Sequence, residues 1–392
     1  MNTPAEFKDM RSLEDNEIRG AILTLLNDPE FRKVVKDNVK GVPIWALKLY
    51  TRRFKTVNSF QIGMIHPFLE KILKEATTGF SHDFTAISNK REDYLYMSNH
   101  RDIVLDSAFL DYILLLSGRT SVEIGIGNNL LIHPWIETLV RLNRSFIVNR
   151  SATAAELLES SHKLSSYIRF VIEQKKCPVW LAQREGRAKD SNDRTQKSVL
   201  KMLAMSGPDD MSLSEKLQSL HICPLTISYE YDPCDWLKAA EFQLKRDNPD
   251  YVKSEQADLD NMKTGIYGFK GHLHYHVNAP IDSEIAALDC SVPRNQFLDQ
   301  VARIIDNHIF RGYMIYPCNH IALDLLNGDE AESANYTAPR KALAFLYNLI
   351  ILPKAVLNLE PSFLNSNAID IDNLSQRGRA NLVSLHMWMD TY

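Results

Sequence analysis

A histidine flanked by aspartates is the strongest chemical feature of the sequence. The segment MSNHRDIVLD at residues 97–106 follows a short apolar run and leads into a longer one. Imidazole exchanges protons near neutral pH, so His100 could remove the proton of an attacking hydroxyl group. A carboxylate on the other ring nitrogen would fix the tautomer and stabilise the cation, and Asp102 and Asp106 are both candidates. Aspartates also cap helices in proteins of every function, so His100 alone does not establish a site.

A second chemical feature is a run of basic residues in a chain whose formal net charge is -4. Its members are Arg184, Arg187, Lys189, Arg194 and Lys197. Guanidinium groups hold phosphate through paired charge-assisted hydrogen bonds. A merely solvated charge run is the competing interpretation. Gly186, inside this run, permits a tight turn and a close approach of the backbone to a ligand. The cluster indicates either a phosphate site or an exposed charged surface.

The elements that would position these residues alternate between short apolar runs and helical stretches. We expect strands at residues 94–97, 122–126, 146–148, 178–182, 222–229 and 273–277, with helices at 106–116, 134–142 and 152–173 between them. This alternation is typical of an α/β fold with a mixed, mostly parallel sheet covered by helices. His100 would follow the first of these strands, at the end where open α/β sheets place their sites. Pro224 belongs at a sheet edge or among the first residues of its strand.

Helical regions flank this core on both sides. The expected organisation is a helical N-terminal region (1–85), an α/β core (86–285) and a helical C-terminal region (286–392) packed on the core. Apolar residues at 297, 301, 304, 305 and 309 share one helical face, and 327–339 is an expected loop. Residues 43–54 mix apolar side chains with Lys48, Arg52 and Arg53. They could lie in a membrane interface, but a helix packed on the core with its charges in water is the favoured interpretation.

Four segments, in this order, resemble the motifs of the glycerolipid acyltransferases, a family that includes glycerol-3-phosphate and 1-acylglycerol-3-phosphate acyltransferases. The first is the His100 segment, which matches the family's His-x-x-x-x-Asp motif and its following arginine, Arg101, but has one extra residue before Asp106. An inserted residue turns a helix by about 100°. His100 can therefore meet Asp106 only if the insertion lies in the turn before the helix, and Asp102 is the alternative partner.

The other three segments follow at later predicted strands. They are RSFIVNR at 144–150, ending in Arg150; VWLAQREGR at 179–187, with Glu185, Gly186 and Arg187; and ICPLTISYE at 222–230. Lys197 falls where the family has a lysine. The resemblance extends over about residues 90–326. It implies a glycerolphosphate acyltransferase-like fold.

The resemblance also implies direct transfer of a fatty acyl group from acyl-CoA or acyl-ACP to a hydroxyl of glycerol 3-phosphate or a lysophospholipid, in phospholipid biosynthesis. His100 would be the general base and Asp106 its partner, without metal or bound cofactor. The residues implied in substrate or phosphate binding are Arg101, Arg150, Glu185, Gly186, Arg187 and Lys197. Two alternatives remain: acylation of a non-phosphate lipid acceptor, and a non-catalytic lipid- or membrane-binding protein with the same fold.

Bulk composition narrows the class of protein further. The negative net charge argues against a nucleic-acid binder, and five scattered cysteines without a Cys-x-x-Cys pair argue against disulfides or a cysteine zinc site. The first thirty residues lack the apolar core of a signal peptide, and no apolar stretch approaches the roughly 20 residues of a membrane span. We expect a cytoplasmic protein, peripheral on the cytoplasmic face of the membrane, with the membrane surface as a partner and no nucleic acid.

Three histidines at alternate positions, His272, His274 and His276, place three imidazoles on one face of a predicted strand. Zinc is one interpretation of this pattern. Ligands on a single extended strand diverge too far to close a tetrahedron without other contributors. A wet sheet face is the prediction.

Overall fold

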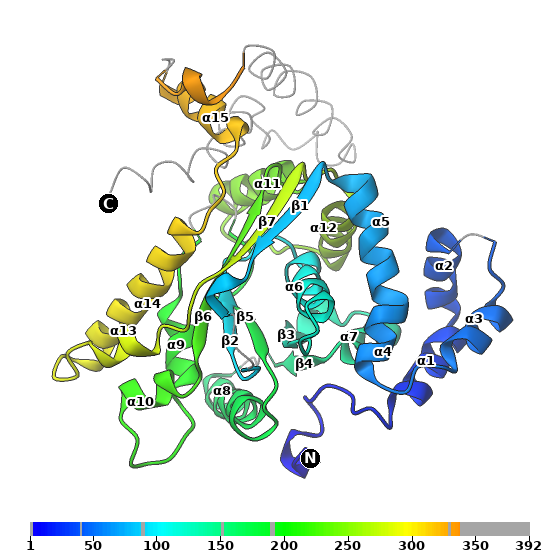
Figure 1. Ribbon diagram of the computed structural model, residues 1–392, viewed down its shortest axis with the longest axis horizontal. Helices are drawn as coiled ribbons and strands as arrows, with labels where there is room; N and C mark the ends of the chain where they lie inside the picture. The colour runs from blue at the N-terminus through cyan, green and yellow to red at the C-terminus, as the bar shows by residue number, and fades with distance from the viewer. Residues whose placement is uncertain are drawn as a thin grey trace.

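A seven-stranded sheet forms the centre of the computed structural model, which describes residues 3–39, 41–87, 91–149, 153–188, 193–327 and 331–337. The strand order is β1-β7-β6-β2-β5-β3-β4 (Figure 1). The strands are β1 (Gly79–Asp83), β2 (Leu95–Ser98), β3 (Glu123–Gly127), β4 (Ser145–Val148), β5 (Val179–Ala182), β6 (Ile222–Tyr229) and β7 (His272–Val277). Only β6 and β7 pair antiparallel. The predicted mixed, mostly parallel α/β sheet is confirmed.

All six predicted strands are confirmed to within one residue at either end, and β1 is an additional strand. The predicted helical N-terminal region (1–85) thus also contains a strand, Gly79–Asp83, which pairs parallel with β7. This segment, GFSHD, contains a single large apolar residue and has no fully buried side chain. An edge strand with one neighbour does not require the apolar run by which the other strands are recognised.

Helices cover both faces of the sheet. One face carries α5 (His66–Ala76) and α6 (Leu105–Leu116), and the other carries α8 (Ala154–Arg169), α9 (Lys197–Leu203) and α14 (Arg294–Arg311). Strand side chains alternate between faces, so Leu95 and Met97 of β2 enter the core under α8 and α14. Tyr96 enters the core under α5 and α6. The short β2 strand is thus buried on both faces, which holds its carboxyl end in place.

The first helices form a separate layer at one side of the molecule, on the right in Figure 1. They are α1 (Ile18–Asn27), α2 (Pro29–Asn38), α3 (Ile44–Thr51) and α4 (Val57–Phe60), and they share a core with α7 (Pro134–Leu142). Asp28 caps α2 by accepting hydrogen bonds from the backbone N–H groups of Glu30 and Phe31, with Pro29 at the first helical position.

The remaining helices connect or follow the later strands. They are α10 (Leu213–Gln218), α11 (Asp235–Asp247), α12 (Glu255–Tyr267), α13 (Asp282–Ala286) and α15 (Pro317–Asn327). Short 3-10 or π turns occur at Ala5–Phe7, Gln61–Ile65, Thr85–Ile87, Asn128–Leu130, Phe170–Gln174 and Ser333–Asn335. Across the described residues, no helix has both the length and the apolar character that a bilayer crossing requires.

The C-terminal region agrees with prediction as far as it is described. In α14, Phe297, Val301, Ile305 and Ile309 are buried, as their spacing indicates. Residues 331–337, within the predicted loop, are exposed or half-buried. Residues 338–392 lie outside the described part of the chain, so the rest of the predicted helical C-terminal region stays a prediction.

Pro224 is the third residue of β6, a strand in the middle of the sheet. Its carbonyl accepts a 2.9 Å hydrogen bond from the backbone N–H of Asn278, just beyond the end of β7. The nitrogen and carbonyl of one strand residue face the same neighbour. The missing N–H of Pro224 therefore faces the segment after β7, and the ladder between β6 and β2 loses nothing.

Candidate active site

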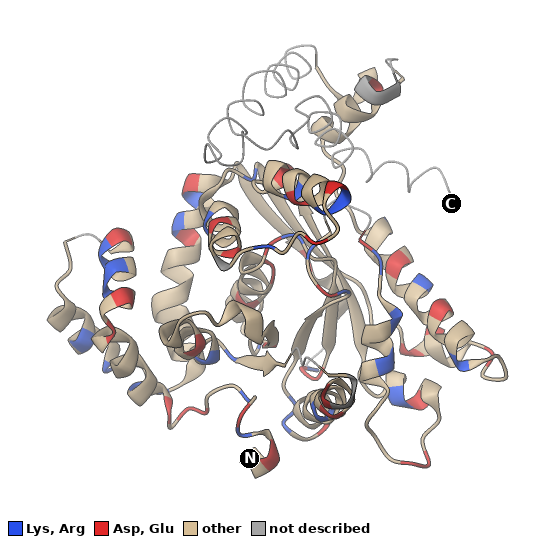
Figure 2. Ribbon diagram, turned by 180° about the vertical axis from the view of Figure 1, so that it is seen from behind, with Lys and Arg blue, Asp and Glu red and all other residues tan. Residues whose placement is uncertain are grey.

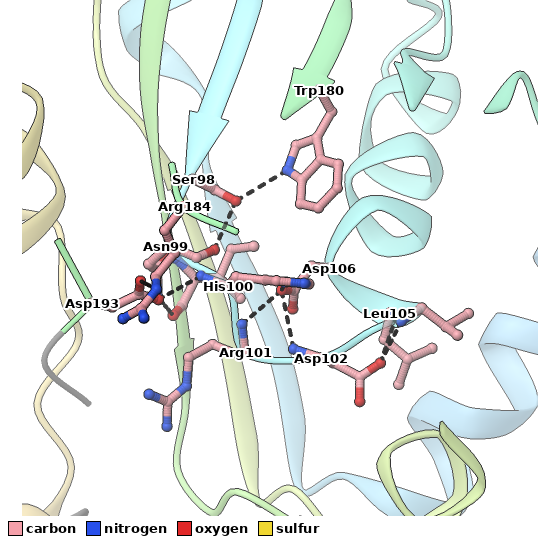
Figure 3. Close-up of polar contacts among 12 residues, drawn as sticks. Ser98, Asn99, His100, Arg101, Asp102, Leu105, Asp106, Trp180, Arg184 and Asp193 are labelled. Carbon is pink, nitrogen blue, oxygen red and sulfur yellow. Dashed lines mark hydrogen bonds and ion pairs between the residues drawn. The ribbon is translucent and has the colours of Figure 1, made fainter. Parts of the chain in front are cut away.

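A tightly bonded turn joins β2 to α6 and carries His100. Asn99, the first residue of the turn, is buried and clamps it to the neighbouring strand β6. Its side-chain amide donates to the carbonyl of Ile227 at 3.0 Å, and its Oδ1 accepts from the N–H of the same residue at 2.8 Å. The two ends of the amide thus fix where the chain leaves the sheet. His100 follows immediately (Figure 3).

Asp106 is the carboxylate that His100 meets. His100 Nδ1 lies 2.9 Å from Asp106 Oδ2, and the Asp106 side chain is only 1% exposed. The same oxygen accepts the backbone N–H groups of Arg101 at 2.7 Å and Asp102 at 3.0 Å. Regular helix begins at Leu105, so the extra residue lies in the turn and does not rotate Asp106 away. The extra residue thus lies before the helix, which is the condition under which His100 and Asp106 can meet.

Asp102 has a different position. Its Oδ1 accepts the N–H groups of Val104 and Leu105, both at 2.8 Å, and Figure 3 shows the carboxylate turned toward Leu105 and away from His100. Burial raises the pKa of Asp102, and the charge of Asp106 adds to the rise. Helix α12 packs closely here, because a Cβ on Gly265 would overlap the Asp102 carboxylate. Asp102 therefore shapes the start of α6.

The second ring nitrogen of His100 has a different environment. Among the described residues, Nε2 has no hydrogen-bond partner, and the side chain is 14% exposed. The ring lies edge-on to Trp180 of β5, with 5.9 Å between ring centroids. If Nδ1 carries the proton that binds Asp106, the Nε2 lone pair is available to accept another. An imidazole held in this way can act as a general base.

Asp193 completes the turn from a distant part of the chain. Its Oδ2 accepts the backbone N–H of His100 at 2.6 Å, and the residue is fully buried, which raises its pKa. The N–H groups of residues 100, 101, 102, 104 and 105 are all bonded to the carboxylates of Asp193, Asp106 or Asp102. These donors hold the turn and are not free to bind an oxyanion. Asp193 carries no motif in the sequence, which explains why it was not predicted.

Arg101 points into a buried cluster of charges beside the turn. Its Nη2 lies 3.4 Å from Asp232 Oδ2, which Lys238 Nζ also contacts at 2.5 Å. Lys238 donates a further hydrogen bond to the Arg101 carbonyl at 3.0 Å. Burial disfavours the charge on Asp232, but Lys238 and Arg101 outweigh it and lower its pKa to about 2. Asp232 and Lys238 belong to the connection between β6 and β7, and the sequence analysis missed both.

The segment after β5 turns at Gly186, whose φ of +69° is a left-handed conformation that favours glycine. Arg187 then points inward and is 8% exposed, with Nη2 bonded to Asn261 Oδ1 at 2.9 Å. Its Nη1 is buried and finds no hydrogen-bond partner among the described residues. Glu185 points outward and is exposed, and its backbone N–H donates to Gln196 Oε1. Of these three predicted residues, the structure buries only the guanidinium.

One predicted phosphate-binding residue is not brought to this cluster, and another is not among the described residues. Lys197, the first residue of α9, is exposed and lies 2.9 Å from Asp299 of α14, its only ion pair within the described part of the chain. It contacts none of the other predicted site residues that are described, because its helix turns it toward α14. Arg150 lies outside the described residues; β4 before it ends at Val148.

The histidines of β7 share one half-buried face with β1. Ser81 Oγ lies 3.2 Å from His272 Nε2 and 2.8 Å from His274 Nδ1, and His276 Nδ1 lies 3.5 Å from Asp83 Oδ2. Among the described residues, no three or more His, Cys, Asp or Glu side chains are grouped so that they could hold a metal ion. The row is a polar sheet face.

The His100 turn lies within the part of the chain that matches a known family. Residues 82–228 match the family model described as Acyltransferase. The 1-acyl-sn-glycerophosphate (LPA) acyltransferase PlsC from Thermotoga maritima matches as a solved structure with a TM-score of 0.37 and 12% identity. That match covers 75% of this chain and 97% of PlsC. No curated protein gives a significant match.

Proposed function

We propose that this protein transfers a fatty acyl group from an acyl thioester to a hydroxyl of a glycerol-phosphate-like acceptor. The observation that supports this proposal most strongly is the 2.9 Å contact between His100 Nδ1 and Asp106 Oδ2, with Nε2 left open. A base oriented in this way suits the activation of a hydroxyl group. The match of residues 82–228 to the Acyltransferase family narrows the reaction to acyl transfer.

The proposed reaction needs no covalent enzyme intermediate. His100 Nε2 takes the proton of the acceptor hydroxyl as its oxygen attacks the thioester carbonyl carbon. The C–S bond then breaks, and the leaving thiolate takes the proton from the imidazolium, giving an ester and a free thiol. Asp106 stabilises the imidazolium formed in between. A positioned base contributes about 10²- to 10⁴-fold, so holding the two substrates together must supply much of the rest.

Arg187 is the best-supported candidate for the acceptor phosphate. Its guanidinium is buried, its charge acts on Asp102 of the His100 turn, and Nη1 has no partner among the described residues. A phosphate oxygen could accept a charge-assisted hydrogen bond from this nitrogen. Arg101, Arg150, Glu185 and Gly186 remain proposed substrate contacts. For Lys197 the exposed pair with Asp299 gives no support.

The donor, proposed as acyl-CoA or acyl-ACP, and the place in phospholipid biosynthesis rest on the sequence resemblance. Acylation of a non-phosphate lipid is the second enzymatic candidate. The non-catalytic alternative depended on whether the extra residue separates His100 from Asp106, and their contact argues against it.

The test is an acyl-transfer assay with purified protein, acyl-CoA and acyl-ACP, and a panel of acceptors. The panel contains glycerol 3-phosphate, a lysophospholipid, and the dephosphorylated counterpart of each, with products identified by mass spectrometry. We expect ester formation only with the phosphorylated acceptors. Equal use of both kinds would favour the non-phosphate alternative, and no transfer with any donor and acceptor would refute acyltransferase activity.

A further inference from the structure

A long part of the N-terminal region contains no acidic residue. Between Asp37 and Glu70 the sequence has no Asp or Glu, although the whole chain has a net charge of -4. The same stretch contains five basic residues: Lys40, Lys48, Arg52, Arg53 and Lys55. A positive segment of this length in an acidic protein indicates a surface that faces negative charge.

Helix α3 lies within this stretch and packs on the molecule through one side only. Leu47 and Thr51 are buried against the core of the N-terminal helices, and Ile44 packs against the same core. On the outer side, Trp45 is 70% exposed and Leu49 is 57% exposed. These two residues are four positions apart and therefore lie on the same face of the helix. The fold does not use this face.

The exposed apolar surface continues beyond the helix. It comprises Val42, Trp45, Leu49, Tyr50 and Ile62, which we call the α3 surface. Tyr50 joins its two parts, since its hydroxyl donates to the carbonyl of Gly63, next to Ile62, at 3.1 Å. Contiguous exposed apolar residues that include an aromatic mark interaction sites more often than isolated ones do.

Basic side chains surround the α3 surface. None of Lys48, Arg52, Arg53 and Lys55 forms an ion pair with a carboxylate of the described residues, and Arg53 lies over the Tyr50 ring at 4.0 Å. Helix α3, at the side of the molecule on the left in Figure 2, carries one basic residue, Lys48, and no acidic one. Tryptophan, leucine and basic residues on one helix face are the composition of segments that lie in a membrane interface.

We propose that the α3 surface docks on an anionic lipid bilayer, with Trp45 and Leu49 inserted at the boundary between headgroups and acyl chains. Lys48, Arg52, Arg53 and Lys55 would then contact the negatively charged headgroups. The interpretation that the sequence favoured for residues 43–54, a helix packed on the core, describes one side of α3. The exposed Trp45 and Leu49 on the other side support the membrane-interface alternative as well. The proposal does not depend on acyl-transfer chemistry.

The test is flotation of the full-length protein with vesicles of phosphatidylcholine alone or mixed with phosphatidylglycerol. We expect flotation with the anionic vesicles, weakened by salt, and little with the neutral ones. Replacing Trp45 and Leu49 together by Gln should weaken partitioning about tenfold or more. Each of Arg52→Gln and Arg53→Gln should weaken it about fivefold.

Matched controls come from exposed apolar residues elsewhere. Leu116, at the end of α6, is 61% exposed and Val252 is 84% exposed. The double change of these two residues to Gln removes as many exposed apolar side chains and should leave flotation unchanged. Thermal unfolding of each variant checks that the fold is intact, which we expect because all four side chains lie in solvent.

Two outcomes would overturn the proposal. One is failure of the wild-type protein to float with anionic vesicles at low salt. The other is equal flotation of the Trp45/Leu49 variant and the Leu116/Val252 variant, which would place the contact elsewhere or on a protein partner. A protein that floats as expected but transfers no acyl group would refute the proposed function and leave this inference standing.

Discussion

Two histidine-containing regions of this molecule differ in how their imidazoles are held. His100 stands alone, with Nδ1 on a buried carboxylate whose oxygen also accepts two backbone N–H groups. His272, His274 and His276 are three in a row, held by a serine hydroxyl, a tyrosine hydroxyl and a half-exposed carboxylate. The β7 row has more imidazoles, but none of them is oriented by a buried carboxylate as His100 is. A candidate base is distinguished by the group bonded to its other ring nitrogen, because that group fixes the tautomer and the orientation of the ring and stabilises the cation.

The largest effect should come from His100→Ala. Loss of the base should reduce kcat/KM by about 10²- to 10⁴-fold. The fold should be retained because backbone N–H groups bonded to Asp193 and Asp106 hold the turn. His274→Ala, the matched change in the β7 row, should change the rate less than about tenfold. Steady-state kinetics of both variants with the best donor and acceptor measure this. Similar losses in the two variants would erase the distinction between the regions.

The next largest effect should separate the two aspartates. Asp106→Asn should reduce the rate by much of the factor expected for His100→Ala, because an amide cannot stabilise the imidazolium as a carboxylate does. Asp102→Asn keeps an oxygen for the N–H groups of Val104 and Leu105 and should stay within about tenfold of wild type. The comparison requires kcat for both variants at saturating substrate. The reverse order of losses would show that Asp102 serves His100 in the working enzyme.

The charged groups at the start of α11 should appear in the pH dependence of stability. Burial, and then the charge of Asp232, raise the pKa of Asp235 to about 7 from its ordinary 3.8. A raised carboxyl pKa favours the folded state at low pH, and this contribution is lost as pH rises from about 4 to 7. Asp235→Asn should remove this loss, at most about 4 kcal/mol, so the variant gains stability relative to wild type above pH 7.

Urea unfolding at pH 5 and pH 8 measures this difference. The exposed Asp250→Asn is the control and should leave the pH dependence as it is in wild type. A wild-type slope preserved in Asp235→Asn would mean that this carboxyl titrates in the ordinary range.

The smallest effect is expected from metal. A zinc site on the β7 row would raise the free energy of unfolding by about 2.7 kcal/mol when zinc is present at 100 times its dissociation constant. We expect no such increase, and no loss of activity with a chelator. Zinc-dependent stabilisation that disappears in a His272/His274/His276 triple alanine variant would make the row a metal site.

Much of the fold could be predicted because local sequence patterns indicate its strands and helices. The six strands with apolar runs and the face of α14 follow from periodicity, and His100 follows a strand in the motif itself. The edge strand β1 could not be recognised, since an edge position needs no apolar run. The residues around His100 were predicted where they are close in sequence and missed where they are distant: Asp193 is 93 positions away, and Lys238 is 137 positions from Arg101.

The sequence by itself determined the order of the six predicted strands, the candidate base and the charge pattern of residues 38–69. Only the tertiary structure decided between Asp102 and Asp106, because the choice depends on where regular helix begins after the turn. It alone separated the inward Arg187 from the outward Glu185 and Lys197, which are all polar residues in one short stretch. The exposed side of α3 was decided in the same way. Which side of a helix meets the core is set by neighbours that the chain brings together only on folding.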